Sequence, residues 1–447
     1  MLTTPLFTRL FTTEEFGIFS LYNAWEQLFL LLLALPLFQS LQNLNVKGLN
    51  KDRIISAVIG LNISLCLCWL VVYLFLRNSV SGWLDLSLPI CDLLFLQLLF
   101  QPVISNWMVQ QAFYYKYKKM AIISLSSSFL SVILSLLFVI SVDHYKVEAR
   151  ILASVLVVAV IALILLAETY KTDKHFYDKY VWKFSLTFCI PLLPHFLAEY
   201  VLSTSNRLII NMYCSKSEVA IFSVAYSIAL ILTLVTSSIN TSFSPWQMRK
   251  LADKDYSKLS PLAINIFILL SIFLFLLMIF GPEVTLIIGG KKYIDAVYLL
   301  PPICLGVFFN YMFQIFARVE TYYERKGYLV TATLICSVIS IAINYFLIPV
   351  FGYALAAYTT LFCYISLCLT HYYFYRRVCR EELGGVHIYN RKQLVLLSVV
   401  MMAISSIILL SYDYILLRMI ILVSIITITI TLYKRSQLFS VLKFSHS

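Results

Sequence analysis

Long apolar runs, separated by short polar or basic segments, follow one another along almost the whole chain. A membrane-spanning α-helix needs about 20 mainly apolar residues, and each run is close to that length. Residues 2–11 are equally apolar but too short, so they resemble the end of a helix whose first half precedes Met1; a position along the membrane surface is the alternative. The pattern therefore predicts this partial first helix and thirteen full spans, at residues 16–39, 54–76, 86–113, 120–142, 149–168, 184–207, 219–244, 260–281, 296–319, 328–350, 352–375, 394–411 and 415–433.

The composition excludes a water-soluble protein. Only 13% of the 447 residues are charged, whereas about 25% is usual in soluble proteins. Hydrophobic residues make up 61%, more than a soluble globule can cover with polar surface. A net charge of +12 would suggest nucleic-acid binding in a soluble chain, but basic residues collect in the cytoplasmic loops of membrane proteins. We therefore expect membrane lipids, and no nucleic acid, among the partners.

The sequence holds no pattern typical of a metal site or a cofactor. Most of the ten cysteines lie inside apolar runs, without metal-ligand spacing. The run Gly289-Gly290-Lys291-Lys292 lacks the spacing of a phosphate-binding loop. We therefore predict no metal and no cofactor, and no ATP-binding site.

The basic residues predict how the chain is threaded through the membrane. If the partial helix is counted as the first, every second connection is rich in Lys and Arg, and the other connections are poor in them. Basic loops lie on the cytoplasmic side, so these connections and the C-terminus are predicted to be cytoplasmic. They hold 25 of the 34 basic residues, at 47–53, 116–119, 171–183, 249–258, 318–326, 376–392 and 434–443.

Two short matches indicate an internal repeat. Residues 15–21 (EFGIFSL) match 218–224 (EVAIFSV) at an offset of 203, and 131–133 (SVI) match 337–339 at an offset of 206. The offset contains an even number of helices, so both copies cross the membrane in the same direction. Parallel repeats of this kind build transporters. We predict an all-α polytopic membrane protein with two parallel six-helix lobes around a central cavity and a C-terminal helix pair, divided at 1–175, 176–380 and 381–447.

Four stretches share their residue pattern with one family. They are 8–19 (TRLFTTEEFGIF), 206–226, 243–246 (FSPW) and 344–352 (NYFLIPVFG). On these stretches the chain resembles the Wzx-type polysaccharide flippases, including O-antigen exporters, of the multidrug/oligosaccharidyl-lipid/polysaccharide exporter superfamily. The resemblance covers nearly the whole chain. It departs from the family pattern at three positions: Asn206 stands where Asp is favoured, and Ala220 and Leu355 stand where Gly is usual.

The resemblance implies a transporter of the bacterial cytoplasmic (inner) membrane and not an enzyme. Its substrate would be an oligosaccharide linked through pyrophosphate to a polyprenol, flipped by alternating access during O-antigen, lipopolysaccharide or other polysaccharide assembly. A proton or sodium gradient would supply the energy, and the C-terminal helix pair would be associated with the lipid tail. Other membrane proteins of polysaccharide assembly are further expected partners.

Such a substrate needs cations in a polar cavity, because pyrophosphate cannot leave water without replacement partners. Arg suits this purpose, since its planar fork binds phosphate oxygens bidentately. Arg9, Arg207 and Arg318 lie in or at the ends of spans, and we predict that they bind the pyrophosphate. Arg9 and Arg207 occupy corresponding helices of the two repeats and could face each other. The simpler interpretation is that each extends to the membrane interface.

Ionisable residues inside spans are the candidates for ion coupling. Glu26 lies in the span 16–39, and His195 and Glu199 are four residues apart on one face of a helix. A His–Glu pair can exchange a proton near neutral pH; a structural hydrogen bond is the alternative. Pro191 and Pro194 in the same span remove backbone donors and predict a bend.

Three other functions stay open. An O-antigen polymerase is equally apolar but usually carries a long periplasmic loop, and the outside segments here are short. A drug or cation antiporter of the same superfamily usually has twelve helices, so the C-terminal pair argues against it. A lipid II flippase is a closer alternative, weakened by the few charged residues in the first spans.

Overall fold

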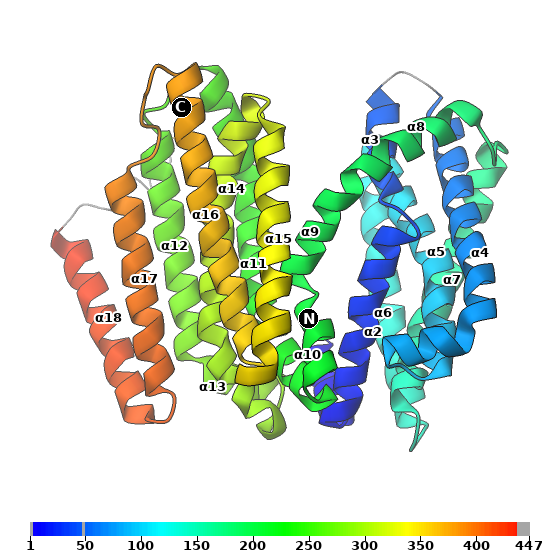
Figure 1. The fold of residues 1–447 in the computed structure, drawn as a ribbon, viewed down its shortest axis with the longest axis horizontal. Coiled ribbons are helices and arrows are strands. Elements are labelled where there is room, and N and C mark those ends of the chain that lie inside the picture. Colours follow the sequence, from blue (N-terminus) through cyan, green and yellow to red (C-terminus); the bar gives the residue numbers. More distant parts are fainter. Residues whose placement is uncertain (1–2, 47–49, 436–447) are drawn as a thin grey trace. The chain divides into compact units, whose positions relative to one another are not determined.

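The computed structural model describes residues 3–46 and 50–435, and every element in these ranges is a helix (Figure 1). Lys47, Lys443 and the rest of the tail, which the topology prediction uses, lie outside the described residues. The helices are α1 (Thr4–Leu10), α2 (Thr13–Leu32), α3 (Leu37–Val46), α4 (Lys51–Leu84), α5 (Leu88–Phe113), α6 (Tyr117–Ile140), α7 (Lys146–Thr172), α8 (Lys179–Cys189), η1 (Ile190–Leu192), α9 (Leu193–Ser203), α10 (Asn206–Tyr213), α11 (Lys216–Ala252), α12 (Leu259–Ile279), α13 (Gly281–Ile288), η2 (Lys291–Leu299), α14 (Leu300–Tyr322), α15 (Lys326–Phe351), α16 (Leu355–Glu382), α17 (Arg391–Ser411) and α18 (Ile415–Arg435).

Helices stand at all thirteen predicted spans, which confirms the all-α polytopic fold. Within the described residues, ten helices are long and apolar enough to cross a membrane, and the bent pair α2 and α3 makes eleven. The remaining two are α16 and α18. Tyrosines and His371 make α16 more polar than the other spans, and the apolar part of α18 within the described residues ends at Ser424.

The chain forms two compact units. Of the described residues, 3–46, 50–223 and 330–359 form the N-terminal unit, and 224–329 and 360–435 form the C-terminal unit. The boundaries fall inside α11, α15 and α16, and α15 from Val330 onward belongs to the N-terminal unit. These units follow the contacts within the chain, and the division at 1–175, 176–380 and 381–447 stays a prediction.

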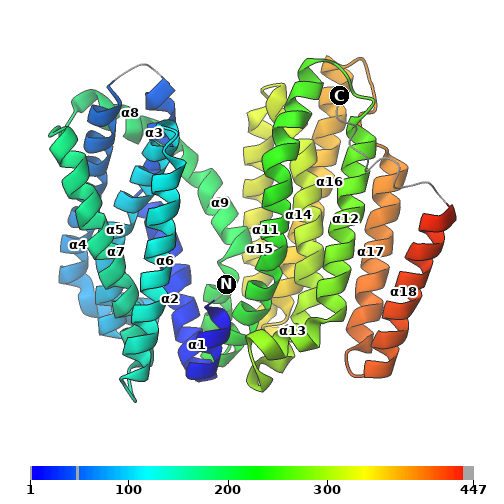
Figure 2. The same cartoon turned by 180° about the vertical axis from the view of Figure 1, so that it is seen from behind.

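In the N-terminal unit, α5 lies between α4 and α7, and α3 and α8 pack across the bundle. Their buried faces form one core, with Leu41, Val58, Trp107 and Ala162 among its fully covered side chains. Helix α6 packs along α7 (Figure 2). Its remaining face exposes large apolar residues such as Phe129, as expected of a helix in contact with lipid.

Two spans of the N-terminal unit are interrupted. Helices α2 and α3 meet at an angle of 46°, where the sequence predicts a straight span over 16–39. Pro36 lacks an N–H and breaks the ladder, and the Asn62 amide donates to the Ala34 carbonyl that lies at the break. The second interruption confirms the predicted bend, because η1, which contains Pro191, separates α8 from α9.

In the C-terminal unit, α12, α14 and α17 pack together, and α18 lies against α17 (Figure 1). The predicted C-terminal pair is therefore α17 and α18. The connection between these two helices is fastened to α12 and α13, because Tyr412 Oη donates to the Met278 carbonyl at 2.9 Å and Arg418 pairs with Glu283 at 2.9 Å.

In the N-terminal unit, two ion pairs connect helix ends. Each pair joins residues that the basic-residue pattern places on the same side of the membrane. Arg53 pairs with Asp178 at 2.6 Å on one side, and Lys216 pairs with Asp85 at 3.3 Å on the other. Asp178 caps α8, and the Val181 backbone N–H, together with the Arg53 guanidinium, lowers the pKa of its carboxyl. The carboxylate therefore stays charged at neutral pH.

The ion pairs of the C-terminal unit likewise connect ends that are predicted to lie on the same side of the membrane. Arg325 pairs with Glu382 at 3.1 Å, both in connections predicted to be cytoplasmic. The Arg418–Glu283 pair joins two connections predicted to be periplasmic. In each unit, these ion pairs therefore connect ends predicted to share a side.

The internal repeat has a physical basis in two capping boxes. Thr12 and Glu15 cap the start of α2 reciprocally, and Ser215 and Glu218 make the same pair of hydrogen bonds at the start of α11. A capping box satisfies two free backbone donors, which explains why the match begins at Glu15 and Glu218.

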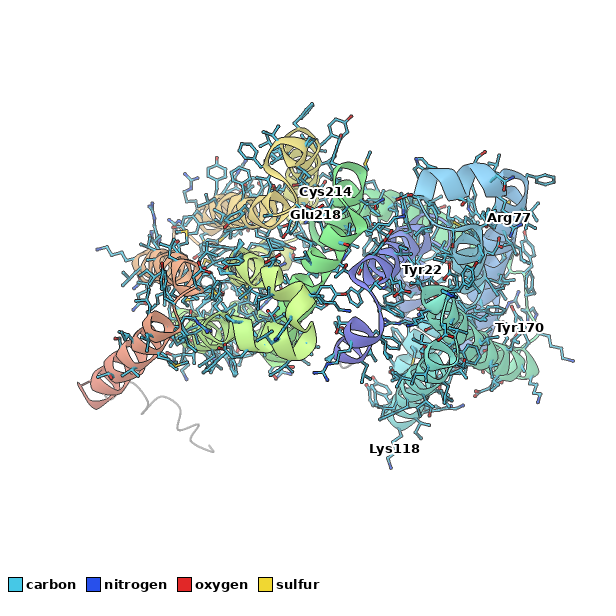
Figure 3. The ribbon with its side chains drawn as sticks, turned by 90° about the horizontal axis from the view of Figure 1, so that it is seen from below. Tyr22, Arg77, Lys118, Tyr170, Cys214 and Glu218 are labelled. Carbon is cyan, nitrogen blue, oxygen red and sulfur yellow. The ribbon has the colours of Figure 1, made fainter. Side chains whose placement is uncertain are left out.

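The two capped helix starts also touch each other. Thr13 Oγ1 and Ser217 Oγ lie 3.0 Å apart, and a Cβ at Gly17 would come within 1.9 Å of the Lys216 carbonyl oxygen. Only glycine allows this approach. The end of α10 and the start of α11 are marked in Figure 3 by Cys214 and Glu218.

Candidate functional site

Arg207 lies on the short helix α10, next to a buried pair of amides. The Asn344 Nδ2 donates to Asn206 Oδ1 at 2.7 Å, and both residues are fully buried. The second and fourth family stretches therefore meet in space. The pair gives the buried Asn206 Oδ1 a hydrogen-bond donor.

The Arg207 guanidinium is half-buried, and its Nε donates to Ser223 Oγ at 3.0 Å. Ser223 lies on α11, in the copy of the repeat that follows the second capping box. The contact fixes the base of the fork, since Nε belongs to the plane that carries the two terminal nitrogens.

Arg9 lies exposed on α1 and makes no hydrogen bond or ion pair with any other described residue. Helix α1 itself is held by Arg150 of α7. The Arg150 guanidinium is buried on α7, 3.5 Å from the ring centre of Phe7 and 3.6 Å from that of Phe19. Cations bind aromatic faces in this way, so Arg150 anchors the helix that carries Arg9.

His195 and Glu199 lie together on α9, as their spacing predicts, with Nε2 and Oε1 3.6 Å apart. Glu199 is 60% exposed and His195 19% exposed, while the His195 Nδ1 is buried without a hydrogen-bond partner among the described residues. The pair is held by one helix and lies directly after the break at η1.

Glu26 is half-buried on α2 and accepts a hydrogen bond from Gln97 Nε2 at 3.3 Å. Its neighbour Gln27 accepts one from Thr204 at 3.2 Å and lines a cavity of about 240 Å³ at the break between α2 and α3. Helix α2 packs against α9, the helix that carries His195 and Glu199.

Arg318 lies on α14 in the C-terminal unit. Its Nη1 donates to Gln247 Oε1 at 3.0 Å and its Nη2 donates to Asn240 Oδ1 at 2.5 Å, while its guanidinium lies 5.5 Å from the ring centre of Phe243. Phe243 belongs to the third family stretch. Asn240 lines a cavity of about 350 Å³ between α11, α14 and α16.

A second His–Glu pair was missed by the sequence analysis. Glu320 on α14 and His371 on α16 are 1% and 0% exposed, and His371 Nδ1 lies 3.0 Å from both carboxylate oxygens. The Phe313 ring stacks on the imidazole. A search for pairs along one helix cannot find it, because the partners lie on different helices, and the only sequence signal is two ionisable residues at the ends of apolar runs.

Comparison with known families adds to this geometry. A family model described as polysaccharide biosynthesis protein matches residues 1–251, more than half of the chain. The chain belongs to this family. A second model, MatE, matches residues 191–346. None of the curated protein sequences matches the chain.

Solved structures show which fold the chain has. The lipid II flippase MurJ in an inward closed conformation has a TM-score of 0.66 at 13% identity, covering 97% of this chain and 96% of that chain. An inward-facing multidrug resistance MATE family transporter of the MOP superfamily has a TM-score of 0.63 at 12% identity, covering 85% and 91%. The predicted resemblance to this exporter superfamily is therefore confirmed at the level of the fold.

Proposed function

We propose that this chain flips polyprenyl-pyrophosphate-linked oligosaccharides across the bacterial cytoplasmic membrane by alternating access. The match of residues 1–251 to polysaccharide biosynthesis proteins carries the proposal. The MOP-superfamily fold, which the chain shares with a lipid II flippase, supports a transporter rather than a polymerase. O-antigen or lipopolysaccharide assembly is the proposed setting.

We assign pyrophosphate binding to Arg207, with Arg9 and Arg318 as further candidates. Arg207 keeps its side chain ordered through Ser223 while it stays partly accessible. Arg9 is exposed and has no competing partner among the described residues. Arg318 already donates to two neutral amides, so its role is less direct.

Ion coupling is assigned to Glu26, His195 and Glu199. The His195–Glu199 pair combines an accessible carboxylate with a partly buried imidazole, and such a pair can take up and release a proton. The break at η1 places this pair on a segment that can change its angle relative to α8.

The cytoplasmic side is assigned from the basic residues. A reporter fused after Lys254 or Arg380 should lie in the cytoplasm and one fused at Lys292 in the periplasm. The C-terminus then faces the cytoplasm.

Complementation tests the proposal. A host lacking the gene should lose the surface polysaccharide and accumulate the lipid-linked oligosaccharide, and the wild-type chain should restore export. Arg207→Ala should abolish export at unchanged protein level, and Arg207→Lys should retain part of it because the charge survives without the fork. Arg249→Ala, which changes an exposed Arg, is the control. Wild-type export by Arg207→Ala would remove this residue from the site.

The match of residues 191–346 to MatE favours a drug or cation antiporter as the second candidate. The same gene deletion separates the two functions. An antiporter would change the drug sensitivity of the host and leave the surface polysaccharide intact.

A further inference from the structure

The cavity in the C-terminal unit is polar but carries no charge. It measures about 350 Å³ and is lined by residues of α11, α14 and α16, a volume near the lower end of the range for small-molecule sites, about 300–1,000 Å³. None of its lining residues is ionised at neutral pH. The polar groups are amides and hydroxyls, among them Thr233, Ser237, Asn240, Asn310, Gln314 and Tyr364.

The amides form a chain whose direction is fixed by Arg318. A guanidinium can only donate, so Asn240 must present its oxygen to Arg318 and its Nδ2 to Gln314 Oε1, at 2.8 Å. Gln314 Nε2 in turn donates to Asn310 Oδ1 at 2.5 Å. The last amide therefore faces the cavity with its N–H donors, and the preceding hydrogen bonds polarise them.

The hydroxyls on the opposite wall offer acceptors. Thr233 Oγ1 donates to the Leu230 carbonyl at 2.7 Å, and Ser237 Oγ donates to the Leu234 carbonyl at 3.0 Å. Each hydroxyl donates its only proton to a backbone carbonyl of its own helix, so its oxygen can still accept a hydrogen bond from a ligand. The cavity thus presents donors from α14 and acceptors from α11.

An aromatic wall completes the lining. Tyr226 and Tyr364 are half-buried at the cavity. A Cβ at Gly306 would lie 3.4 Å from the Tyr364 ring, an ordinary contact distance, so this ring lies directly beside α14. Tyrosine rings supply flat apolar surface beside polar groups.

Resting on the proposed function, we infer that this cavity binds one or two neutral sugar residues of the lipid-linked oligosaccharide. A sugar hydroxyl donates and accepts at once, which matches the donors of Asn310 and the acceptors of Thr233 and Ser237. The C–H face of a pyranose ring fits a tyrosine ring. Pyrophosphate is excluded because no cation lines the cavity and burial of an unpaired anion is costly.

The test uses the glycan without its lipid and phosphate. Lipid-linked oligosaccharide is extracted from the host that lacks the gene, and mild acid releases the free oligosaccharide as the probe. Its affinity for the purified full chain is measured by saturation-transfer NMR and by calorimetry.

Two variants and a matched control decide the result. Asn310→Leu should weaken binding about 10-fold or more and Ser237→Ala about 2- to 10-fold, the range for one or two hydrogen bonds. Ser238→Ala is the control, because Ser238 donates to the same Leu234 carbonyl but does not line the cavity. It should bind like the wild type.

The outcomes separate this inference from the proposed function. If the wild type does not bind the free glycan, or if Ser237→Ala and Ser238→Ala bind it equally well, the cavity assignment is wrong even when the wild type restores export. If the wild type restores no export in the gene deletion, the proposed function fails, whatever the affinity for the glycan.

Discussion

Two His–Glu pairs in the described residues contain the same chemical groups in opposite surroundings. His195 and Glu199 share helix α9, lie 3.6 Å apart and leave the carboxylate 60% exposed. Glu320 and His371 lie on two different helices, with Nδ1 and the carboxylate 3.0 Å apart. Their side chains are only 1% and 0% exposed. In the second pair, the contacts of His371 Nδ1 with the carboxylate replace part of the water that both groups lose. The other ring nitrogen, Nε2, is buried without a hydrogen-bond partner among the described residues.

The difference indicates two roles. A pair that reaches water can exchange protons and respond to a substrate, whereas a pair sealed between α14 and α16 holds those helices together. Exposed pairs contribute at most about 1 kcal/mol to stability. Removal of one partner from a buried pair costs about 3–5 kcal/mol. Each prediction below tests one side of this contrast.

The largest effect is expected for Glu320→Ala. It leaves His371 buried without its partner, and we expect the free energy of unfolding to fall by about 3 kcal/mol. Thermal and denaturant unfolding of the purified protein measure it. Glu199→Ala is the control, with a change below about 0.5 kcal/mol. Equal effects of the two substitutions would remove the contrast.

A double substitution shows whether the buried pair acts as a unit. Glu320→Met combined with His371→Leu replaces both polar groups by apolar ones of similar size, so neither is left without a partner. The double variant should be more stable than Glu320→Ala, with a coupling of about 1–3 kcal/mol between the sites. Additive losses would show that the two groups are stabilised separately.

These pairs also show what a sequence can predict. The His195–Glu199 pair follows from helical spacing alone, and apolar runs located every span. The matching residues that begin at Glu15 and Glu218 indicated the repeat. Contacts between helices distant in sequence were not accessible in this way, since no periodicity connects Glu320 with His371 or Arg150 with Phe7.

Local breaks were predicted only where their chemistry is unambiguous. Pro191 and Pro194 predicted the bend that the structure has at η1. Pro36 lies near the end of its apolar run, where it reads as the limit of a span, and the structure shows that α3 continues the span beyond it. The Asn62 amide that covers the break comes from another helix, so the sequence around Pro36 did not contain it.

The smallest effect on stability, and a specific effect on transport, is expected for Glu199→Gln. The protein should unfold like the wild type, within about 0.5 kcal/mol. Export should fall and its dependence on external pH should change, because a carboxamide cannot take up a proton. Polysaccharide export at several pH values measures it. An unchanged pH profile would exclude Glu199 from ion coupling.

The most direct test of the account is translocation by the purified protein. The full chain is placed in liposomes with labelled polyprenyl-pyrophosphate oligosaccharide, and a glycan-oxidising reagent that cannot cross the membrane is added. With the wild-type chain and an ion gradient, lipid from the inner leaflet should be flipped to the outer leaflet and oxidised there, whereas with Arg207→Ala only the lipid that starts in the outer leaflet should be oxidised. If, with the wild-type chain, only the lipid that starts in the outer leaflet is oxidised, the proposed flippase activity is contradicted.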